Sequence, residues 1–242
     1  MAEWFEDWFN TKYYHILYDH RNDEEANAFI KRLSDELALP QKARILDLAC
    51  GQGRHARFFN ELGYNVVGVD LSEESILSAK SFENESLFFH CHDMRNTMNF
   101  GEFDLVCNLF TSFGYFENQT DNLTVLNSIR PSLKNNGILV IDFLNAEKVK
   151  AELIAEQIVI KGGITFQISR NIENDRIVKT ISFKDNSNDF NFQEKVQLLT
   201  LSDFEELLKK SGFKILTVFG DYNLGKFAPK NSERLILVAQ KV

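Results

Sequence analysis

The chain has few cysteines and no long apolar segment. Its three cysteines, Cys50, Cys91 and Cys107, are odd in number and lack the paired spacing of a metal site or a disulfide framework. Each lies next to a predicted strand end in apolar sequence, so we expect reduced, structural thiols and a cytoplasmic protein. No run of about 18 apolar residues occurs, and the acidic, aromatic N-terminus differs from a basic leader. We therefore expect no membrane span and no secretion.

The chain also lacks a basic patch. Its 27 lysines and arginines are outnumbered by 35 aspartates and glutamates, which gives a formal charge of -8 at pH 7. Binding to a phosphate backbone needs a concentrated Lys/Arg surface, which no segment provides. We therefore expect no nucleic-acid partner. The expected substrate is a small molecule or, as the second choice, a protein.

What the chain does have is an alternation of apolar, strand-like runs with helical segments between residues 44 and 143. This order predicts an α/β fold with a doubly wound, mostly parallel sheet. Ser72 is the predicted N-cap of one helix, and residues 121–137 are predicted to form another that stops at Asn136-Gly137. The predicted strands are residues 43–49, 65–70, 86–91, 103–110 and 137–144.

The pattern changes after Asn145. Four segments that alternate in hydrophobicity or are rich in branched and aromatic residues are separated by turn-like sequences, which predicts a small antiparallel β insertion. A capped helix from Ser202 to Gly212 follows. Two closing strands, residues 213–220 and 234–242, would then complete the main sheet to seven strands. The predicted strands of the insertion are residues 156–163, 164–171, 176–183 and 190–199.

Residues 45–56, ILDLACGQGRHA, predict a buried strand, a glycine turn and the start of a helix. Gly51 and Gly53 remove side chains that would block the close approach of a nucleotide-like ligand. Asp47 would repel a pyrophosphate, whereas it would attract the ammonium and sulfonium of S-adenosylmethionine. This sign of charge favours a methyl donor over NAD, although the turn also fits a loose dinucleotide motif.

Two further aspartates end the next two strands. Asp70 can accept hydrogen bonds from both ribose hydroxyls of an adenosine. Asp93 is expected to accept from the adenine amino group, while the Met94 backbone N–H meets a ring nitrogen. Each aspartate alone also fits a helix cap or a strand end. Three in order at successive strand ends favour an adenosyl ligand.

With these motifs the chain resembles the class I S-adenosylmethionine-dependent methyltransferases, over about residues 41–145 and the closing strands. The resemblance implies a Rossmann-like cofactor domain formed by residues 1–149 and 200–242, with an N-terminal helical lid (1–38) and a β cap (150–199). The last strand would be antiparallel. Many relatives have a glycine at Ala49. Because alanine adds only a Cβ, we expect a local adjustment of the amino-acid end of the cofactor and not a loss of binding. The resemblance implies a cofactor site at Asp47, Ala49, Gly51, Asp70, Leu71, Asp93, Met94 and Leu109.

Two alternatives remain open at this point. An NAD-dependent oxidoreductase would share the turn and Asp70 but would give Asp47 and Asp93 no role. A non-catalytic sensing or scaffold protein with a methyltransferase fold would bind the donor weakly. The insertion is expected to shape the acceptor site or a subunit contact, as in a homodimer.

The acceptor side is expected to follow the fourth strand, at the carboxyl edge where open α/β sheets bind ligands. Phe110, Phe113 and Tyr115 are candidates for this pocket, although many of the 22 phenylalanines must belong to the core. Asp142 and Asn145, after the fifth strand, are weaker candidates. No dedicated catalytic residue is required, because the donor is already activated.

The N-terminal segment offers a second set of candidates. Tyr14, Tyr18 and Arg21 share one helical face, so Tyr14 or Arg21 could reach the carboxylate of the cofactor in the manner of a lid. The competing interpretation is that the aromatic residues only attach these helices to the body. If the acceptor must lose a proton, His15 or Asp142 is the candidate base.

Three other histidines need an assignment. His55 is expected to face solvent. His90 and His92 alternate on one strand, but a third ligand at a suitable spacing is missing, so strand-end packing is expected and no metal.

Overall fold

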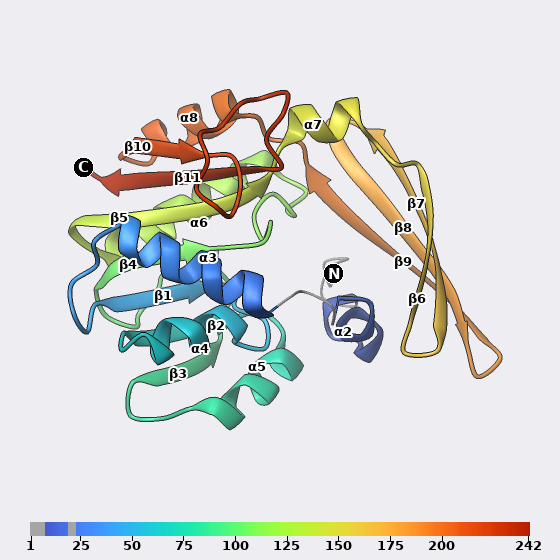
Figure 1. The fold of residues 1–242 in the computed structure, drawn as a ribbon, viewed down its shortest axis with the longest axis horizontal. Helices are drawn as coiled ribbons and strands as arrows, with labels where there is room; N and C mark the ends of the chain where they lie inside the picture. The colour runs from blue at the N-terminus through green and yellow to red at the C-terminus, as the bar shows by residue number, and fades with distance from the viewer. Residues whose placement is uncertain (1–7, 19–22) are drawn as a thin grey trace.

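The computed structural model describes residues 8–18 and 23–242, which form two β-sheets (Figure 1). The larger sheet has the strand order β10-β11-β5-β4-β1-β2-β3. Strand β11 is antiparallel to both of its neighbours, and the other pairs are parallel. This confirms the predicted doubly wound sheet with an antiparallel last strand. Its strands are β1 (Arg44–Leu48), β2 (Asn65–Asp70), β3 (Leu87–Cys91), β4 (Phe103–Asn108), β5 (Leu133–Leu144), β10 (Phe213–Phe219) and β11 (Arg234–Lys241).

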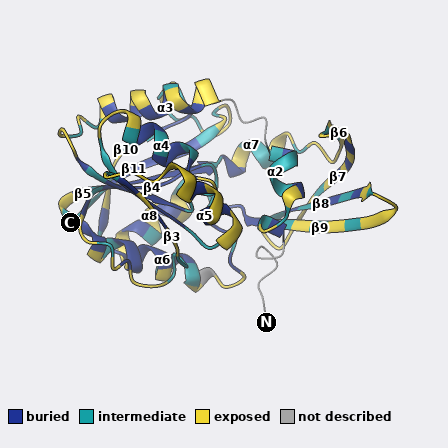
Figure 2. Cartoon of the chain, turned by 90° about the horizontal axis from the view of Figure 1, so that it is seen from below, coloured by how far each residue is buried: buried dark blue, intermediate teal, exposed yellow. Residues whose placement is uncertain are grey.

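Two apolar cores cover the two faces of this sheet, with α3 above it and α6 below it in Figure 2. One core joins the strands to α3, α4 and α5 through side chains such as Phe29 and Phe59. The other joins them to α6 and α8 through Val125 and Phe204. Both faces of the central strands are thus apolar, as parallel strands require. The helices are α3 (Asp23–Glu36), α4 (Arg54–Glu61), α5 (Glu73–Ala79), η1 (Lys80–Phe82), α6 (Gln119–Ser132), α7 (Ala146–Ala151) and α8 (Leu201–Lys210).

The helix ends are in part as predicted. Ser72 caps α5, because its hydroxyl accepts a hydrogen bond from the Ser75 N–H at 3.1 Å, as expected. The predicted start of α8 is wrong. Its N-cap is Thr200, which exchanges hydrogen bonds with Asp203 in a capping box, so the helix begins before Ser202.

The predicted end of α6 is also wrong. The helix stops at Ser132, just after Pro131, and β5 starts at the next residue. Asn136 has a φ of 61° inside that strand, close to where the β4–β5 register shifts. The Asn-Gly pair therefore forms an irregularity in a strand instead of a helix stop.

The smaller sheet confirms the predicted antiparallel insertion. Its strands follow the chain in the order β6-β7-β8-β9, with every pair antiparallel. Three two-residue turns connect these strands, and all the turn residues have positive φ. The turns are Gly162-Gly163, Asn174-Asp175 and Asn186-Ser187. The strands are β6 (Glu156–Lys161), β7 (Ile164–Glu173), β8 (Arg176–Asp185) and β9 (Asn188–Gln197).

Helix α2 (Lys12–Tyr18) lies between the two sheets in Figures 1 and 2. Its residues Tyr13 and Leu17, together with the fully buried Trp8, pack on Phe166 and Phe183 of the smaller sheet. The smaller sheet thus supports α2 from behind and leaves the opposite side of the helix for the main sheet. Of the N-terminal helical lid expected over residues 1–38, helices α2 and α3 are described, and residues 1–7 and 19–22 lie outside the described residues.

Within residues 8–18 and 23–242, no helix has a stretch long and apolar enough to cross a bilayer. The three cysteines are free. Cys50 and Cys107 are buried, as expected. The apolar surroundings expected for Cys91 are wrong, because this residue is exposed at the end of the edge strand β3.

Candidate active site

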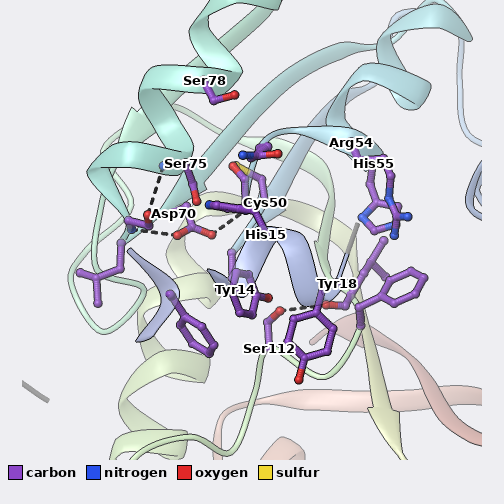
Figure 3. Close-up of a pocket in the computed structure, with 18 of the residues that line it drawn as sticks. Tyr14, His15, Tyr18, Cys50, Arg54, His55, Asp70, Ser75, Ser78 and Ser112 are labelled. Carbon is purple, nitrogen blue, oxygen red and sulfur yellow. Dashed lines mark hydrogen bonds between the residues drawn. The ribbon is translucent and has the colours of Figure 1, made fainter. Parts of the chain in front are cut away.

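A cavity of about 700 Å³ lies at the carboxyl ends of β1, β2 and β4, beneath α2 (Figure 3). Its size is in the range of about 300–1,000 Å³ that is typical of small-molecule sites. The structure brings together most of the residues that the sequence nominated. Those that line the cavity are Tyr14, His15, Ala49, Gly51, Asp70, Leu71, Asp93, Met94, Leu109, Phe110 and Tyr115.

The glycine turn after β1 exposes backbone to this cavity. Ala49, Gly51 and Gly53 all have positive φ, at 61°, 55° and 81°. A Cβ on Gly53 would lie 2.5 Å from the Phe89 ring, whereas a Cβ on Gly51 would meet nothing within 4 Å. Gly53 is therefore required by packing, and Gly51 faces open space where a ligand can approach. Ala49 therefore has the left-handed backbone that glycine adopts most easily.

Asp70 joins this turn to the loop after β2. Its carboxylate accepts hydrogen bonds from the Gly51 N–H and the Ser72 N–H, each at 2.8 Å. Burial raises the pKa of the Asp70 carboxyl, and these backbone hydrogen bonds oppose the rise. A carboxylate fixed at the floor of a cavity in this way can accept the two hydroxyls of a ribose.

Asp47 lies deeper. It is 1% exposed and does not line the cavity, and burial raises the pKa of its carboxyl to about 7. The backbone N–H of Ala56 and the charge of Arg54 lower this pKa in part, while Asp70 raises it. Its Oδ2 is buried without a hydrogen-bond partner. A cationic ligand in the cavity would stabilise this ionised carboxyl across the turn, so the donor set fits the methionine end of S-adenosylmethionine.

Asp93 and Met94 follow β3 and also line the cavity. The Arg95 guanidinium donates to both oxygens of Asp93, at 2.6–3.1 Å. Burial acts to raise the pKa of Asp93, but the hydrogen bonds and the charge of Arg95 outweigh it, and the pKa is lowered. A carboxylate has about four acceptor positions, so Asp93 can still accept from an adenine amino group.

His55 does not face solvent, so that expectation is wrong. It is 8% exposed, and its ring stacks on Phe110 at 4.8 Å with 20° between the planes. Tyr222 also stacks on Phe110, at 5.2 Å. Phe110 thus contacts two rings at the edge of the cavity.

Phe113 is not a pocket residue. It is fully buried and packs on Phe204 of α8, with the ring centroids 5.6 Å apart, on the core side of the chain after β4. Phe113 thus belongs to the apolar core on the α6 and α8 side of the sheet, and most phenylalanines of the described residues are likewise buried. Tyr115, two residues later, does line the cavity.

Asp142 is not placed to act as a base. It is fully buried away from the cavity, and its Oδ1 accepts from Arg234 Nε at 2.7 Å. Its Oδ2 accepts from the Phe110 N–H at 2.9 Å and the Tyr222 hydroxyl at 3.1 Å. Asp142 therefore holds the loop after β4 in place through the Phe110 N–H, from a position outside the cavity. Asn145 likewise does not line the cavity, and its side chain caps α7.

Helix α2 covers the cavity with Tyr14, His15 and Tyr18 (Figure 3). Burial lowers the pKa of His15, against the opposing charges of Glu74 and Asp70, and its Nε2 has no hydrogen-bond partner. At neutral pH the imidazole is therefore neutral and able to take up a proton. Arg21 lies outside the described residues.

The sequence did not reveal how this segment is attached. Ser72 donates to the Asn10 side chain at 2.6 Å, which links the turn before α2 to the loop after β2. On the other side, Glu194 of β9 accepts from Trp8 Nε1 at 2.7 Å and from the Tyr18 hydroxyl at 2.6 Å. These partners are up to 186 residues apart in the chain, so no local pattern could have shown the pairing.

The remaining histidines pack as predicted. His90 stacks on Phe100 at 4.9 Å, and His92 meets the same ring edge-on at 5.2 Å. Within the described ranges, no group of three His, Cys, Asp or Glu side chains could hold a metal ion.

Comparison with known proteins agrees with this geometry. Residues 18–218 match the family described as "Methyltransferase domain". The chain is 30% identical over 217 residues to the Bacillus subtilis protein named "Putative methyltransferase YqeM", which covers 85% of this chain and 87% of that protein. The chain therefore belongs to the methyltransferase-domain family. It is an S-adenosylmethionine-dependent enzyme of the class I, Rossmann-like type, which removes the oxidoreductase and scaffold alternatives.

Two further similarities are informative. The fold matches the crystal structure of an S-adenosylmethionine-dependent methyltransferase from Clostridium acetobutylicum with a TM-score of 0.80, at 22% identity, over 95% of this chain and 96% of the other. A partial match, 28% identical over 123 residues, is to the dTDP-3-amino-3,6-dideoxy-alpha-D-glucopyranose N,N-dimethyltransferase of Streptomyces fradiae. It covers 51% of this chain and 46% of that enzyme.

Proposed function

We propose that this methyltransferase transfers the methyl group of S-adenosylmethionine to a small-molecule acceptor held between the carboxyl edge of the main sheet and α2. The observation that carries this proposal is the cavity of about 700 Å³, which α2 covers and which has both a carboxylate-lined part and an aromatic part. A protein or nucleic-acid acceptor would need an open approach. The relative from Streptomyces fradiae, named for an amino-sugar substrate, supports a small acceptor.

For the donor, we assign each part of the molecule to residues of the main sheet. Asp70 would accept the ribose hydroxyls, and the backbone at Ala49 and Gly51 would hold the methionine part. Asp47 would act through its charge from below the turn. The remaining assignments are Asp93 and Met94 for adenine, Leu71 and Leu109 for packing on the adenosine, and Tyr14 with Arg21 for the carboxylate.

When bound, S-adenosylmethionine supplies a methyl group on a sulfonium that departs as a neutral thioether. The chain's own contribution is to align the acceptor, exclude water and accept a proton where the acceptor carries one. Alignment in a dry site contributes up to roughly 7–11 kcal/mol in well-oriented systems. We assign the acceptance of this proton to His15, because it is neutral and lines the cavity. Its Nε2 is buried, so the ring would have to turn to reach the acceptor.

Three further features extend this proposal. The free cysteines are those of a protein from a reducing compartment such as the cytoplasm. Residues 150–199 would act as a cap on the cofactor domain formed by residues 1–149 and 200–242, with α2 as part of a lid. A homodimer would use a surface away from the cavity.

The experiment is an assay of S-adenosylhomocysteine release with cell extract separated by size. The low-mass fraction should support release, and the protein and nucleic-acid fractions should not. An Asp70→Ala variant serves as the control for release by contaminating enzymes. Release that depends only on the macromolecular fractions would contradict the proposal.

A further inference from the structure

We propose that Gln197 of the smaller sheet is a positioning residue for the methyl acceptor. Gln197 is the last residue of β9, is 4% exposed and does not line the cavity. Its hydrogen bonds hold the chain on both sides of Tyr115, whose side chain does line the cavity. The inference rests on the proposed place of the acceptor, between the main sheet and α2, and not on the size of the acceptor.

The loop after β4, residues 109–118, forms neither helix nor strand, so individual contacts must fix its path. The Gln197 N–H donates to the Gly114 carbonyl at 2.9 Å, and the side-chain Nε2 of Gln197 donates to the Phe116 carbonyl at 3.0 Å. Tyr115 lies between these two bonded carbonyls. One residue of the smaller sheet therefore sets the backbone from which the side chains of Tyr115 and Phe116 enter the cavity wall.

The Gln197 side chain is itself fixed, because Asn122 of α6 donates from Nδ2 to its Oε1 at 2.5 Å. Both side chains are buried, and hydrogen bonds in such a site are stronger than in water and favour a single arrangement. Arg176 faces Gln197 across the β8–β9 pair. Its Nη2 donates to the Phe116 and Glu117 carbonyls, each at 2.8 Å. Two neighbouring strands of the smaller sheet therefore hold the same stretch of the loop.

The other end of the loop is held by the main sheet. Asp142 of β5 accepts hydrogen bonds from the Phe110 N–H at Oδ2 and from the Thr111 N–H at its backbone carbonyl, each at 2.9 Å. Phe110 and Thr111 have φ of 59° and 62°, a left-handed conformation that L-residues disfavour, so these contacts are needed to maintain it. The loop thus spans from one sheet to the other, and the place of Tyr115 depends on the bonds of Gln197.

Positioning of this kind matters for methyl transfer, because the acceptor atom must lie in line with the C–S bond that breaks. The acceptor wall includes Tyr115, whereas the donor wall is held by backbone bonds within the main sheet. Loss of the Gln197 bonds should therefore weaken acceptor binding more than donor binding. A small donor effect is expected through Arg95, which bonds to Asp93 and lies over the Phe116 ring at 4.9 Å.

The test uses Gln197→Leu, which roughly keeps the size of the side chain but can neither donate nor accept a hydrogen bond. The matched control is Gln193→Leu in the same strand, where the exposed amide donates to Thr180 Oγ1 at 3.4 Å. Release of S-adenosylhomocysteine is measured against a dilution series of the cell-extract fraction that supports it. The half-saturating amount of this fraction should rise on the order of 10-fold in Gln197→Leu, because a misplacement of about 1 Å can cost up to about 100-fold. The half-saturating concentration of S-adenosylmethionine should change by less than about threefold.

Both half-saturating amounts should stay at the wild-type level in Gln193→Leu. A purely structural role of Gln197 would lower the maximal rate, because fewer molecules are folded, and would leave the half-saturating amounts unchanged. That result overturns the proposal, and so does a fall in donor affinity as large as the acceptor effect. Arg176→Met removes the second donor to the Phe116 carbonyl and should shift acceptor half-saturation in the same direction, which keeps the test decisive if Gln197→Leu does not fold.

Failure of the proposed function gives a different result. If only the macromolecular fractions support release, the small-molecule function is wrong, and the same dilution series on those fractions still tests Gln197. Hydrogen exchange of backbone amides needs no acceptor at all. It should rise in residues 113–117 of Gln197→Leu and not in those of Gln193→Leu, and unchanged exchange there overturns the proposal.

Discussion

The two walls of the cavity are built from different groups. The wall of the main sheet uses backbone turns and carboxylates, with Gly51 and Asp70 held in place by strands β1 and β2. The wall of α2 and the loop after β4 uses aromatic side chains, such as Tyr14 and Tyr115. The first wall follows from the fold itself, and the second depends on side chains that can change without altering the fold.

The walls also differ in how they are supported. The main-sheet wall rests on two apolar cores, and it contains a buried carboxyl at Asp47 that opposes folding when ionised. The α2 wall rests on the smaller sheet through one apolar cluster and the hydrogen bonds of Glu194. We therefore expect the donor side to be rigid and to lower the stability of the main sheet through the buried Asp47. The acceptor side depends on a small helix that is attached separately.

The largest test of this comparison is Asp47→Asn. Between pH 3.8 and about 7 the folded protein keeps a proton on Asp47 that the unfolded chain has released, so the unfolding free energy falls as pH rises. At about 1.4 kcal/mol per pH unit, the loss attributable to Asp47 is about 4 kcal/mol. Urea unfolding from pH 4 to 8 should show the wild type losing this much stability relative to the variant. Parallel pH profiles would show that Asp47 carries no such cost.

The same variant should bind the donor less well, because it lacks the negative charge below the glycine turn. In the wild type, donor binding should lower the pKa of Asp47 and release a proton near pH 7. Calorimetry in two buffers with different ionisation enthalpies measures this release. Proton uptake on binding would contradict the assigned role of Asp47.

An effect of similar size is expected from Asp70→Ala. The change removes two expected hydrogen bonds from a charged acceptor to the ribose, each worth about 1.5–3 kcal/mol. Affinity for S-adenosylmethionine should therefore fall by about 100-fold or more. Direct titration measures this loss, with Tyr115→Phe on the other wall as the matched control, which should change donor affinity little. Affinity at the wild-type level in Asp70→Ala would remove the ribose assignment.

The α2 wall is tested by Glu194→Gln. The change leaves Lys179 without its counter-charge in a site where both side chains are at most 15% exposed, so a loss of about 2 kcal/mol is expected. Because Trp8 and Tyr18 bond to Glu194, hydrogen exchange should rise in residues 8–18 and not in β1 or β2. The control is Glu206→Gln, which breaks an exposed pair with Lys210 and should change little. Uniform exchange across both walls would mean that α2 is not separately attached.

The same difference between the walls explains what could be predicted from sequence. The strands, the glycine turn and the line of Asp70, Asp93 and Met94 follow local rules of periodicity and strand ends, and the structure places them at one edge of the sheet. The roles of Glu194 and Asp142 depend on partners far away in the chain, such as Trp8 and Arg234, which no local pattern specifies. Phe113 and His55 were misplaced because a residue type does not say which side of a loop it faces.

The smallest expected effect concerns Ala49, where the main-sheet wall departs from the glycine of many relatives. A left-handed backbone costs an L-residue roughly 1–2 kcal/mol, and Ala49 has a φ of 61°. Ala49→Gly removes this cost, but glycine loses about 0.5–1 kcal/mol more backbone entropy on folding. The variant should therefore be more stable by about 0.5–1 kcal/mol, a shift that urea unfolding can resolve. Because the backbone at Ala49 already has the left-handed conformation that glycine would adopt, donor affinity should change by less than about threefold. A larger change would mean that the Ala49 methyl group itself contacts the donor.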